Sequence, residues 1–575
     1  MKKVEGYPQP LGATRIDGKM NFAVSVPSGK RCELLLYRTG MPEPVQIFEM
    51  PEKEGMGEVR FLAVEGFLPE KYEYNFRIGQ RVCVDPYVRE VFRTRKFGEN
   101  PNPQEHQIRG RVPDDTYDWE HDRHLRIPLH DVVAYSLHVR GFTKHTSSKV
   151  KHKGTFQGVV EKLPYLKELG VNQIQCMPVY EFQEVAGNRP NYWGYGTGYY
   201  FAPKPAYSVT GQACRELKDM VKACHREGIE VVLEMPFTVD ILPQKAIECL
   251  KYYMLEYHID GFVVNPYNVP WDSIKQDPLL KGVKIFQKDD GFQNVMRRFL
   301  KGDEGMIHDV IWALRHNTVE DGKFNYITSH TGFTMNDLVS YEAKHNEENG
   351  EHNQDGPNYN YSWNCGAEGP SRKRAVMELR KKQVRNAFFL LLSAQGMPCI
   401  LAGDEFGNTQ KGNNNVYCQD NETSWLNWNK WKANEPLYQY VRKLIELRKA
   451  HPVLHKEEPL LGVDKTACGM PDISYHGEDA WQTPGEVYSR QLGVLYCEAG
   501  EKTDACFIAY NMHWLKHSFA LPTLAKNQKW YRVLDTSGME ISGEPEENQK
   551  CIRLAERSIV FLCGKQETER AGLSR

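Results

Sequence analysis

Acidic side chains stand at the ends of several strand-like segments in the middle of the chain, where they could serve as nucleophile and general acid. They are Glu234, Asp289, Asp290, Asp404 and Glu405. A retaining glycosidase needs two carboxylates about 5–5.5 Å apart across the bond that it cleaves. The residue types therefore permit glycoside chemistry. A carboxylate in such a place can equally cap the next helix or pair with an arginine, and we expect this structural role for Asp404 and Glu405.

The segments that carry these acids alternate with helical patterns, as strands and helices do in a parallel α/β fold. The expected strands are 132–139, 171–179, 230–237, 261–268, 282–287, 325–330 and 397–403. Such units repeated over about 320 residues fit a (β/α)₈ TIM barrel better than a doubly wound sheet. In these barrels the catalytic groups lie at the C-terminal ends of the strands, which is where the acids stand.

Both ends of the chain lack this alternation and are predicted to form β-sandwiches. Short runs of strand character occur at 22–27, 32–38, 58–64 and 72–78, and again at 492–497 and 505–512. We predict an N-terminal β-sandwich at 1–125, a barrel at 126–455 and a C-terminal β-sandwich at 456–575. The stretch 100–131, rich in Pro and charge, is expected to act as a linker.

Composition narrows the function classes. The chain has 575 residues, with 73 Lys and Arg against 75 Asp and Glu, a balance that excludes a strongly basic nucleic-acid binder. No run of 18 apolar residues exists, so we expect no membrane span. No export segment is recognised and the 14 Cys lack metal-ligand or disulfide spacing, which predicts cytoplasmic residence with reduced thiols. We expect no metal and no organic cofactor.

Longer stretches of the sequence resemble one family. They are 7–14 (YPQPLGAT), 136–145 (SLHVRGFTKH), 191–203 (NYWGYGTGYYFAP), 330–351, 360–369, 402–428 and 511–514 (NMHW). These resemble the isoamylase and glycogen-debranching branch of glycoside hydrolase family 13. The resemblance runs along nearly the whole chain. It implies a carbohydrate-binding-like N-terminal β-sandwich, a (β/α)₈ barrel and a C-terminal β-sandwich, and the hydrolysis of α-1,6 branch linkages in glycogen or starch-like glucans.

The chain departs from the resemblance at the catalytic motifs. The nucleophile motif of the family, Gly-Phe-Arg-x-Asp, corresponds here to residues 261–265, where Val263 replaces the Arg and Asn265 the Asp. Lys288 stands where the family has its glutamate acid, and Thr331 where it has the third carboxylate. An amide cannot form the glycosyl ester, so the covalent route is lost. A Lys288 ammonium would also oppose a positively charged transition state, unless Glu234 or Asp289 neutralises it.

Other positions of the innermost sugar subsite are only partly kept. The resemblance implies Tyr192 as the stacking platform under the sugar and His330 as a group that could bond a sugar hydroxyl. The family's His after the strand at 230–235 is missing from residues 234–239. The stretch that follows Lys288 also looks short, which suggests the loss of a pocket loop.

Three functions remain open at this point. The leading interpretation is a non-catalytic protein that binds α-glucan or assists an active debranching enzyme, with self-association also open. The alternative is an active α-1,6-glucan hydrolase whose carboxylates have moved, for example to Asp289 or Asp290. A third is a structural protein without glucan affinity. Two further motifs are expected to be structural: Asn413–Asn415 as a loop-fixing hydrogen-bond network, and 345–352 as a solvated loop rather than a metal site.

Overall fold

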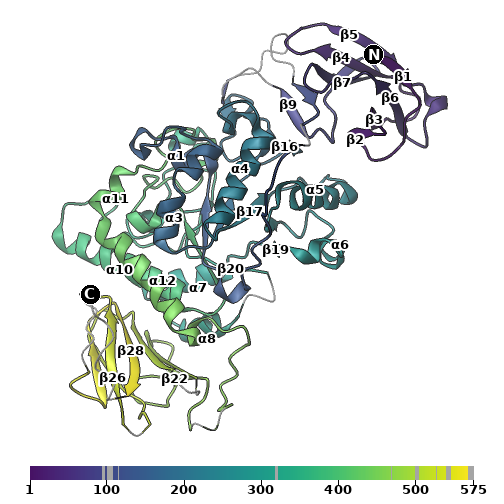
Figure 1. Cartoon of the computed structure of the whole chain (residues 1–575). Helices are drawn as coiled ribbons and strands as arrows, with labels where there is room; N and C mark the ends of the chain where they lie inside the picture. The colour runs from purple at the N-terminus through teal and green to yellow at the C-terminus, as the bar shows by residue number, and fades with distance from the viewer. Residues whose placement is uncertain are drawn as a thin grey trace.

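The chain folds as a barrel with a β domain on either side. The computed structural model describes residues 1–92, 97–99, 108–113, 116–317, 322–465, 467, 469–498, 504–525, 527–538 and 545–566. In Figure 1 the purple N-terminal domain and the yellow C-terminal domain lie on opposite sides of the central helices and parallel strands. No helix in these ranges is long and apolar enough to cross a membrane.

The N-terminal domain consists of two antiparallel sheets that enclose an apolar core. One sheet has the order β1-β6-β3-β2 and the other β5-β4-β7-β10-β9, with β8 paired to β7. The strands are β1 Lys2–Val4, β2 Gly12–Ile16, β3 Lys19–Ser25, β4 Cys32–Arg38, β5 Pro44–Glu49, β6 Val59–Glu65, β7 Tyr72–Ile78, β8 Arg81–Cys83, β9 Glu90–Phe92 and β10 Arg109–Arg111. Inward residues of both sheets, Phe22, Leu34 and Phe76 among them, are completely buried. This is the sandwich that the sequence predicts.

The central domain is a nearly closed parallel barrel in which seven strands are described. They run in the order β19-β18-β17-β12-β11-β21-β20. Their bounds are β11 Ala134–Leu137, β12 Gln173–Cys176, β17 Glu230–Met235, β18 Gly261–Val264, β19 Lys284–Phe286, β20 Phe324–Asn325 and β21 Met397–Leu401. A parallel bridge between Gln287 and Lys323 joins the two ends of the sheet. Apolar side chains such as Val232, Phe286 and Met397 fill the interior.

The barrel architecture is confirmed, but the described residues form seven parallel strands and not the predicted eight. Between β19 and β20 the chain forms two successive helices, α7 Gly291–Lys301 and α8 Ile307–Arg315, and no strand lies between them in the described residues. The bridge from Gln287 to Lys323 therefore makes β19 a direct neighbour of the β20 edge. As a result, Lys288 lies next to the segment that follows β20.

Helices surround the barrel, and a small hairpin lies at its mouth. The other helices are α1 Val139–Lys144, α2 Phe156–Val160, α3 Leu163–Leu169, α4 Ala213–Arg226, α5 Pro243–Tyr257, α6 Trp271–Gln276, α9 Met335–Leu338, α10 Arg374–Ser393, α11 Asn429–Ala433 and α12 Glu435–Ala450. The hairpin strands are β13 Tyr180–Phe182 and β16 Gly198–Pro203, with β14 Val185–Ala186 and β15 Arg189–Pro190 between them. On α4 the buried residues include Leu217, Met220, Val221 and Cys224, the face expected from their spacing.

The C-terminal domain has a five-stranded antiparallel sheet, β22-β23-β24-β28-β26, and a two-stranded one, β25-β27. The strands are β22 Ile473–His476, β23 Gln491–Glu498, β24 Asp504–Asn511, β25 His517–Ala520, β26 Gln528–Asp535, β27 Cys551–Leu554 and β28 Ser558–Gln566. One face of the large sheet packs into the sandwich and the other packs against the barrel. Figure 1 shows α10 and α12 on the side of the barrel that faces these strands.

In the predicted linker, residues 116–131 are anchored to the barrel. Residues 100–107 and 114–115 lie outside the described residues. Within 116–131, the ring of Trp119 stacks on His258 at 3.8 Å between ring centroids. Asp122 accepts hydrogen bonds from His225 and His258. The described part of the stretch is thus a strap held by the barrel rather than a free tether.

Candidate functional site

Four polar side chains meet at the C-terminal end of the barrel strands. Lys288 Nζ lies 2.5 Å from Oε1 of Glu234 and 3.1 Å from both Tyr195 Oη and His330 Nε2. The Tyr195 hydroxyl donates to Glu234 and lies 2.7 Å from His330 Nε2. We call these four residues the Lys288 cluster. It occupies the place in the fold where a barrel enzyme holds its catalytic groups.

Strand ends position the cluster. Glu234 lies opposite Val263 in the β17–β18 ladder, one residue before β17 ends, so its carboxylate reaches the mouth. Lys288 follows β19 by two residues and His330 follows β20 by five. Tyr195 comes from the loop before β16. Four chain segments thus supply the four groups, as parallel strands do when they end at one edge.

The charges of the cluster cancel locally. Burial raises the pKa of Glu234, but the ammonium of Lys288 outweighs this effect and the net pKa is lowered, so the carboxylate is ionised at neutral pH. Burial and Lys288 together lower the pKa of His330 to about 3, so its imidazole is neutral. Because an ammonium can only donate, Nε2 of His330 accepts from Lys288 and the ring proton lies on Nδ1.

The sequence prediction for Tyr192 needs correction. Tyr192 is 2% exposed, and its ring stacks on His138 with centroids 4.1 Å apart. A side chain in this environment is a core residue and not an open stacking platform. Gly194 turns the chain in a left-handed conformation, with φ of +85°, and a Cβ there would lie 2.4 Å from Phe182. This turn places Tyr195, rather than Tyr192, in the Lys288 cluster.

Of the three replaced family positions, only Lys288 has a described contact within the cluster. Asn265 directly follows β18 and Lys288 follows β19 by two residues, so both lie just beyond the ladder in which Val263 is opposite Phe286. The Asn265 side chain is exposed and accepts a hydrogen bond from the backbone of Tyr267. The Thr331 hydroxyl lies 3.1 Å from the hydroxyl of Ser329. His330, in contrast, joins the cluster as the sequence suggested.

The remaining strand-end acids are held by other partners. Asp289 pairs with Lys323 at 3.1 Å, and Asp290 accepts a hydrogen bond from Tyr326 at 2.7 Å. Neither has a described contact with the Lys288 cluster.

Asp404 and Glu405 are structural, as expected. Both are buried, 1% and 0% exposed. Asp404 accepts hydrogen bonds from Thr328 and from the backbone of Met335. Glu405 accepts from the hydroxyls of Tyr135 and Tyr165. Burial raises the pKa of Asp404 to about 8 and that of Glu405 to about 7.

The asparagine run is also structural. Asn414 bonds to Asn346 and Asn360, and Asn413 to Asn349, so the run fixes the loops around the barrel mouth as predicted.

The barrel mouth has a small inner cavity and a larger outer groove. The cavity behind the cluster, lined by His138, Tyr192 and His330, has a volume of about 50 Å³. That is room for a few water molecules and far less than a ligand pocket offers. Outside the barrel, an open groove of about 550 Å³ lies along residues 266–273 and Gln287. Tyr267, 91% exposed, and Trp271 line this groove, which we call the Tyr267 groove.

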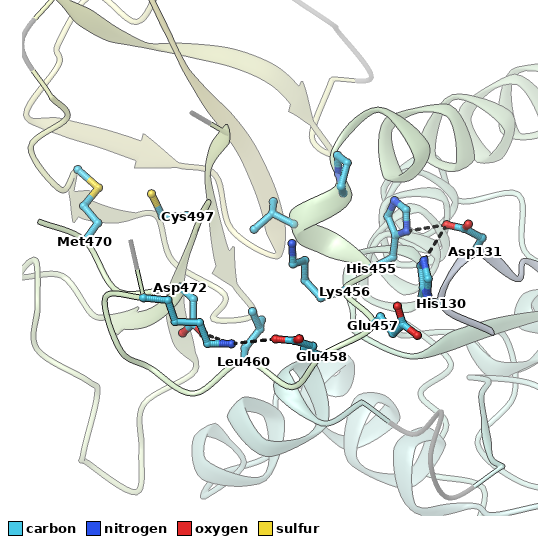
Figure 2. A pocket seen from close by; sticks show the side chains of 13 residues that line it. His130, Asp131, His455, Lys456, Glu457, Glu458, Leu460, Met470, Asp472 and Cys497 are labelled. Atoms are coloured by element: carbon cyan, nitrogen blue, oxygen red, sulfur yellow. Dashed lines mark ion pairs between the residues drawn. The ribbon is translucent and has the colours of Figure 1, made fainter. Parts of the chain in front are cut away.

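A larger cavity, of about 590 Å³, lies at the other end of the barrel (Figure 2). It is lined by residues just before β11 and by the segment between α12 and the C-terminal sheet. In it Asp131 lies 3.7 Å from Nε2 of His130 and 3.2 Å from Nδ1 of His455. Lys465 forms ion pairs with Glu458 and Asp472. Because β11 begins here, the cavity is at the N-terminal face of the barrel, where residues usually serve stability rather than catalysis.

Comparisons with known sequences agree with the fold and the motifs. The family described as alpha amylase, catalytic domain, matches residues 137–237. Isoamylase 1, chloroplastic, of Oryza sativa subsp. japonica is 32% identical, and the match covers 92% of this chain and 82% of the relative. The glycogen operon protein GlgX homolog of Mycobacterium tuberculosis (strain ATCC 25618 / H37Rv) is 29% identical, covering 92% and 93%.

Solved structures have the same architecture. Pullulanase from Bacillus acidopullulyticus superimposes with a TM-score of 0.72 at 19% identity, covering 96% of this chain and 75% of that one. A multi-modular glycogen-degrading pneumococcal virulence factor, SpuA, gives a TM-score of 0.75 at 16% identity, covering 98% and 71%. The multidomain barrel and the match to an isoamylase, 32% identical over 92% of this chain, lead to one assignment. The chain belongs to the isoamylase and glycogen-debranching branch of glycoside hydrolase family 13, a family of glycogen and starch metabolism.

Proposed function

We propose that this chain is a non-hydrolytic member of its family that binds α-glucan and acts beside an active debranching enzyme. The observation that carries the proposal is the 2.5 Å ion pair between Lys288 and Glu234. Lys288 occupies the place where the resemblance puts the proton donor. Glu234 is the only carboxylate with a described contact in the cluster, and the ammonium already engages it.

Chemistry supports the proposal. A retaining mechanism needs a nucleophilic carboxylate and a second carboxyl group that gives up a proton. Asn265 offers an amide for the first role, and Lys288 an amine held by Glu234 for the second. The neutral His330 can still exchange hydrogen bonds with a hydroxyl. The site therefore keeps groups that could bind a sugar but lacks the pair that would cleave a linkage.

The Tyr267 groove is the proposed contact for glucan. An aromatic ring covers the apolar face of a sugar, while neighbouring polar groups bond its hydroxyls. Tyr267 and Trp271 supply the rings, and Asp272, Ser273 and Gln287 supply polar groups along the same groove. The cavity behind the cluster is too small for a sugar ring, which favours an outer groove over an inner subsite. Cytoplasmic residence is part of the proposal.

Affinity electrophoresis in a glycogen gel tests whether the chain binds glucan. A reducing-end assay on glycogen, pullulan and amylopectin, run beside it, tests whether the chain hydrolyses glucan. We expect retardation without reducing-end release. The double variant Tyr267→Ala/Trp271→Ala should lose most of the retardation. Trp312→Ala is the matched control, because Trp312 is 58% exposed on the outer helix α8. Unchanged retardation of the double variant would exclude the groove, and no retardation of the unmodified chain would exclude glucan binding.

The same assay examines relocated carboxylates. Robust release of reducing ends that disappears in Asp289→Ala/Asp290→Ala would establish an active hydrolase and overturn the proposal. We expect no release from either protein, because Lys323 and Tyr326 already hold these two acids.

A further inference from the structure

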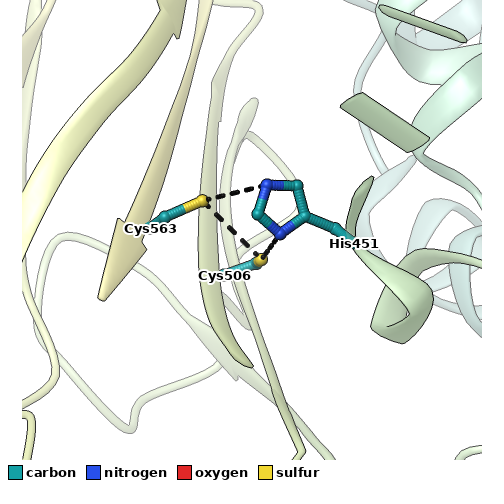
Figure 3. A group of neighbouring side chains, drawn as sticks. All are labelled: His451, Cys506 and Cys563. Atoms are coloured by element: carbon teal, nitrogen blue, oxygen red, sulfur yellow. Dashed lines mark hydrogen bonds between the residues drawn. The ribbon is translucent and has the colours of Figure 1, made fainter. Parts of the chain in front are cut away.

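Two cysteines and a histidine meet where the C-terminal domain packs on the barrel (Figure 3). His451 directly follows α12 and caps it, with its backbone N–H bonded to carbonyls of that helix. Cys506 on β24 and Cys563 on β28 lie directly opposite each other in the antiparallel ladder. Three segments far apart in the sequence thus bring two thiols and an imidazole to one point.

The spacing of the donor atoms fits the coordination shell of a single ion. The two sulfurs are 3.9 Å apart, Cys506 Sγ is 3.6 Å from Nδ1 of His451, and Cys563 Sγ is 3.5 Å from Nε2. In a tetrahedral zinc site with bonds of about 2.3 Å to sulfur and 2.0–2.1 Å to nitrogen, neighbouring donors lie ~3.6–3.8 Å apart. As Figure 3 shows, the ring edge between the two nitrogens faces the sulfurs, so a modest turn of the imidazole aims one nitrogen between them.

The surroundings favour a bound ion as well. Cys506 is 0% exposed and Cys563 is 2% exposed, while His451 is half-buried and leaves a path to solvent. The same cross-strand row continues to Tyr496, which lies opposite Cys506 on β23. The Tyr496 hydroxyl is buried without a hydrogen-bond partner in the described structure. This hydroxyl is therefore a polar group that still needs a partner, and it belongs to the residue paired with Cys506 in the sheet.

We propose that His451, Cys506 and Cys563 bind a zinc ion that fastens the C-terminal β domain to the barrel. Thiolate and imidazole ligands suit zinc and exclude magnesium and calcium, which prefer oxygen. On binding, two S–H bonds break, two Zn–S bonds form and two protons pass to solvent, so binding strengthens as the pH rises. The site joins the end of α12 to β24 and β28, and its role is structural.

The amino-acid sequence alone gives no sign of this site. The three ligands are separated by 55 and 57 positions, and none belongs to a short motif such as CxxC. Only the packing of the sheet against α12 assembles them.

Cobalt(II), a spectroscopic substitute for zinc, provides the test. The full chain is reduced with a phosphine, stripped of metal and titrated with Co²⁺. We expect a thiolate-to-cobalt charge-transfer band that saturates at one equivalent and is bleached by one equivalent of Zn²⁺. Zinc should also raise the thermal midpoint, since a ligand that binds only the folded state stabilises it. Absence of both the band and the shift in the unmodified chain would overturn the proposal, whatever the variants do.

Variants assign the ligands. Cys506→Ser, Cys563→Ser and His451→Gln should each weaken cobalt binding at least about tenfold and diminish the zinc-dependent shift. The matched control is Cys551→Ser on β27 of the same domain, whose thiol contacts only the carbonyl of Ile552 among described partners. A charge-transfer band that survives in both cysteine variants, or one lost in the control, would contradict the assignment.

Discussion

The ammonium of Lys288 lies 2.5 Å from Oε1 of Glu234, and this ion pair lies at the C-terminal ends of β17 and β19. The pair joins the end of β17 to the segment that follows β19, and these two strands are separated in the sheet by β18 alone. The pair is partly buried, with 10% of the Glu234 side chain and 39% of the Lys288 side chain exposed. A cation in this place changes both the stability and the chemistry that the fold permits.

Replacing Lys288 with Met should leave the Glu234 carboxylate buried without its cation. We expect a loss of about 1–2 kcal/mol in unfolding free energy at pH 7, the low end for a broken buried pair because Lys288 is partly exposed. In the native chain the pKa of Glu234 is lowered from 4.5, so its stabilisation is present above that value and is lost as the pH falls through the folded pKa. Urea unfolding at several pH values measures the effect.

The pH dependence should reverse in the variant. Without Lys288, burial dominates and the pKa of Glu234 rises above its ordinary value, so Lys288→Met should recover stability as the pH falls from 7 to 5. The double variant Lys288→Met/Glu234→Gln is the control, and it should show neither the loss at pH 7 nor the recovery. A Lys288→Met loss that is the same at both pH values would show that the charge of Glu234 is not responsible.

His225 should make the stability of the barrel sensitive to alkaline pH. Its ring lies between Asp122 at 2.9 Å and Asp260 at 2.8 Å. Burial lowers the pKa of His225, but the two carboxylates outweigh burial and the net pKa is raised above 6.5. Its stabilisation is therefore complete below pH 6.5 and is lost as the pH rises through the folded pKa. Asp260, with a pKa lowered to about 2, contributes above pH 3.8 and loses that contribution as the pH falls through about 2.

His225→Asn should cost about 3 kcal/mol at pH 6, because it removes the cation that lies between two buried carboxylates. The cost should shrink between pH 6.5 and 9, where the native chain itself loses the interaction. His121→Asn is the control and should change little, because His121 is an exposed histidine next to Asp122 in the stretch 116–131. Thermal unfolding from pH 5 to 9 measures this, and a cost that is constant over that range would contradict the assignment.

The strands were predictable from sequence where local pattern alone decides. Residues 32–38 and 72–78 form the expected strands without any shift, because their apolar runs end at turn residues. Which side chain of a loop points into the barrel mouth was not predictable from local pattern. Tyr192 and Tyr195 are both in the motif NYWGY, and the left-handed turns at Gly194 and Gly196 flank the one that reaches the mouth.

Features that depend on neighbours distant in sequence were harder to predict. The direct approach of β19 to the β20 edge follows from how the barrel closes, which no local pattern encodes. The row that brings Cys506 opposite Cys563 likewise appears only once the strand register is set. For Lys288 the sequence left two candidate partners open, Glu234 and Asp289, and the structure pairs it with Glu234 while Asp289 pairs with Lys323.

Asp404→Asn should be nearly neutral at pH 7. Burial raises the pKa of Asp404 to about 8, so the native side chain is largely protonated there. Asn keeps an acceptor for the backbone N–H of Met335, and the Thr328 hydroxyl can turn to accept from the new amide. Because the folded pKa is raised, the native chain loses stability as the pH rises from 3.8 through about 8, and the variant should lose less. A loss above about 2 kcal/mol at pH 7 would show that the carboxylate is ionised there.

Restoring the family's acid at position 288 should damage the protein rather than activate it. Lys288→Glu places a second carboxylate where an ammonium now contacts Glu234, so two like charges replace an ion pair. We expect this variant to be roughly 1–2 kcal/mol less stable than Lys288→Met at pH 7, and the difference to shrink at pH 5, where one carboxylate takes up a proton.

No activity should follow from single repairs, because the groups of a catalytic site act as a unit. Asn265→Asp alone leaves no proton donor, and Thr331→Asp alone leaves neither nucleophile nor donor. The combination of all three changes with Val263→Arg also has a structural cost, because Val263 is 5% exposed in the apolar barrel interior. We therefore expect no reducing-end release from glycogen by any single variant, measured at equal amounts of folded protein. Turnover by Lys288→Glu alone would show that Asn265 does not block the chemistry and that a carboxylate elsewhere in the mouth serves as nucleophile.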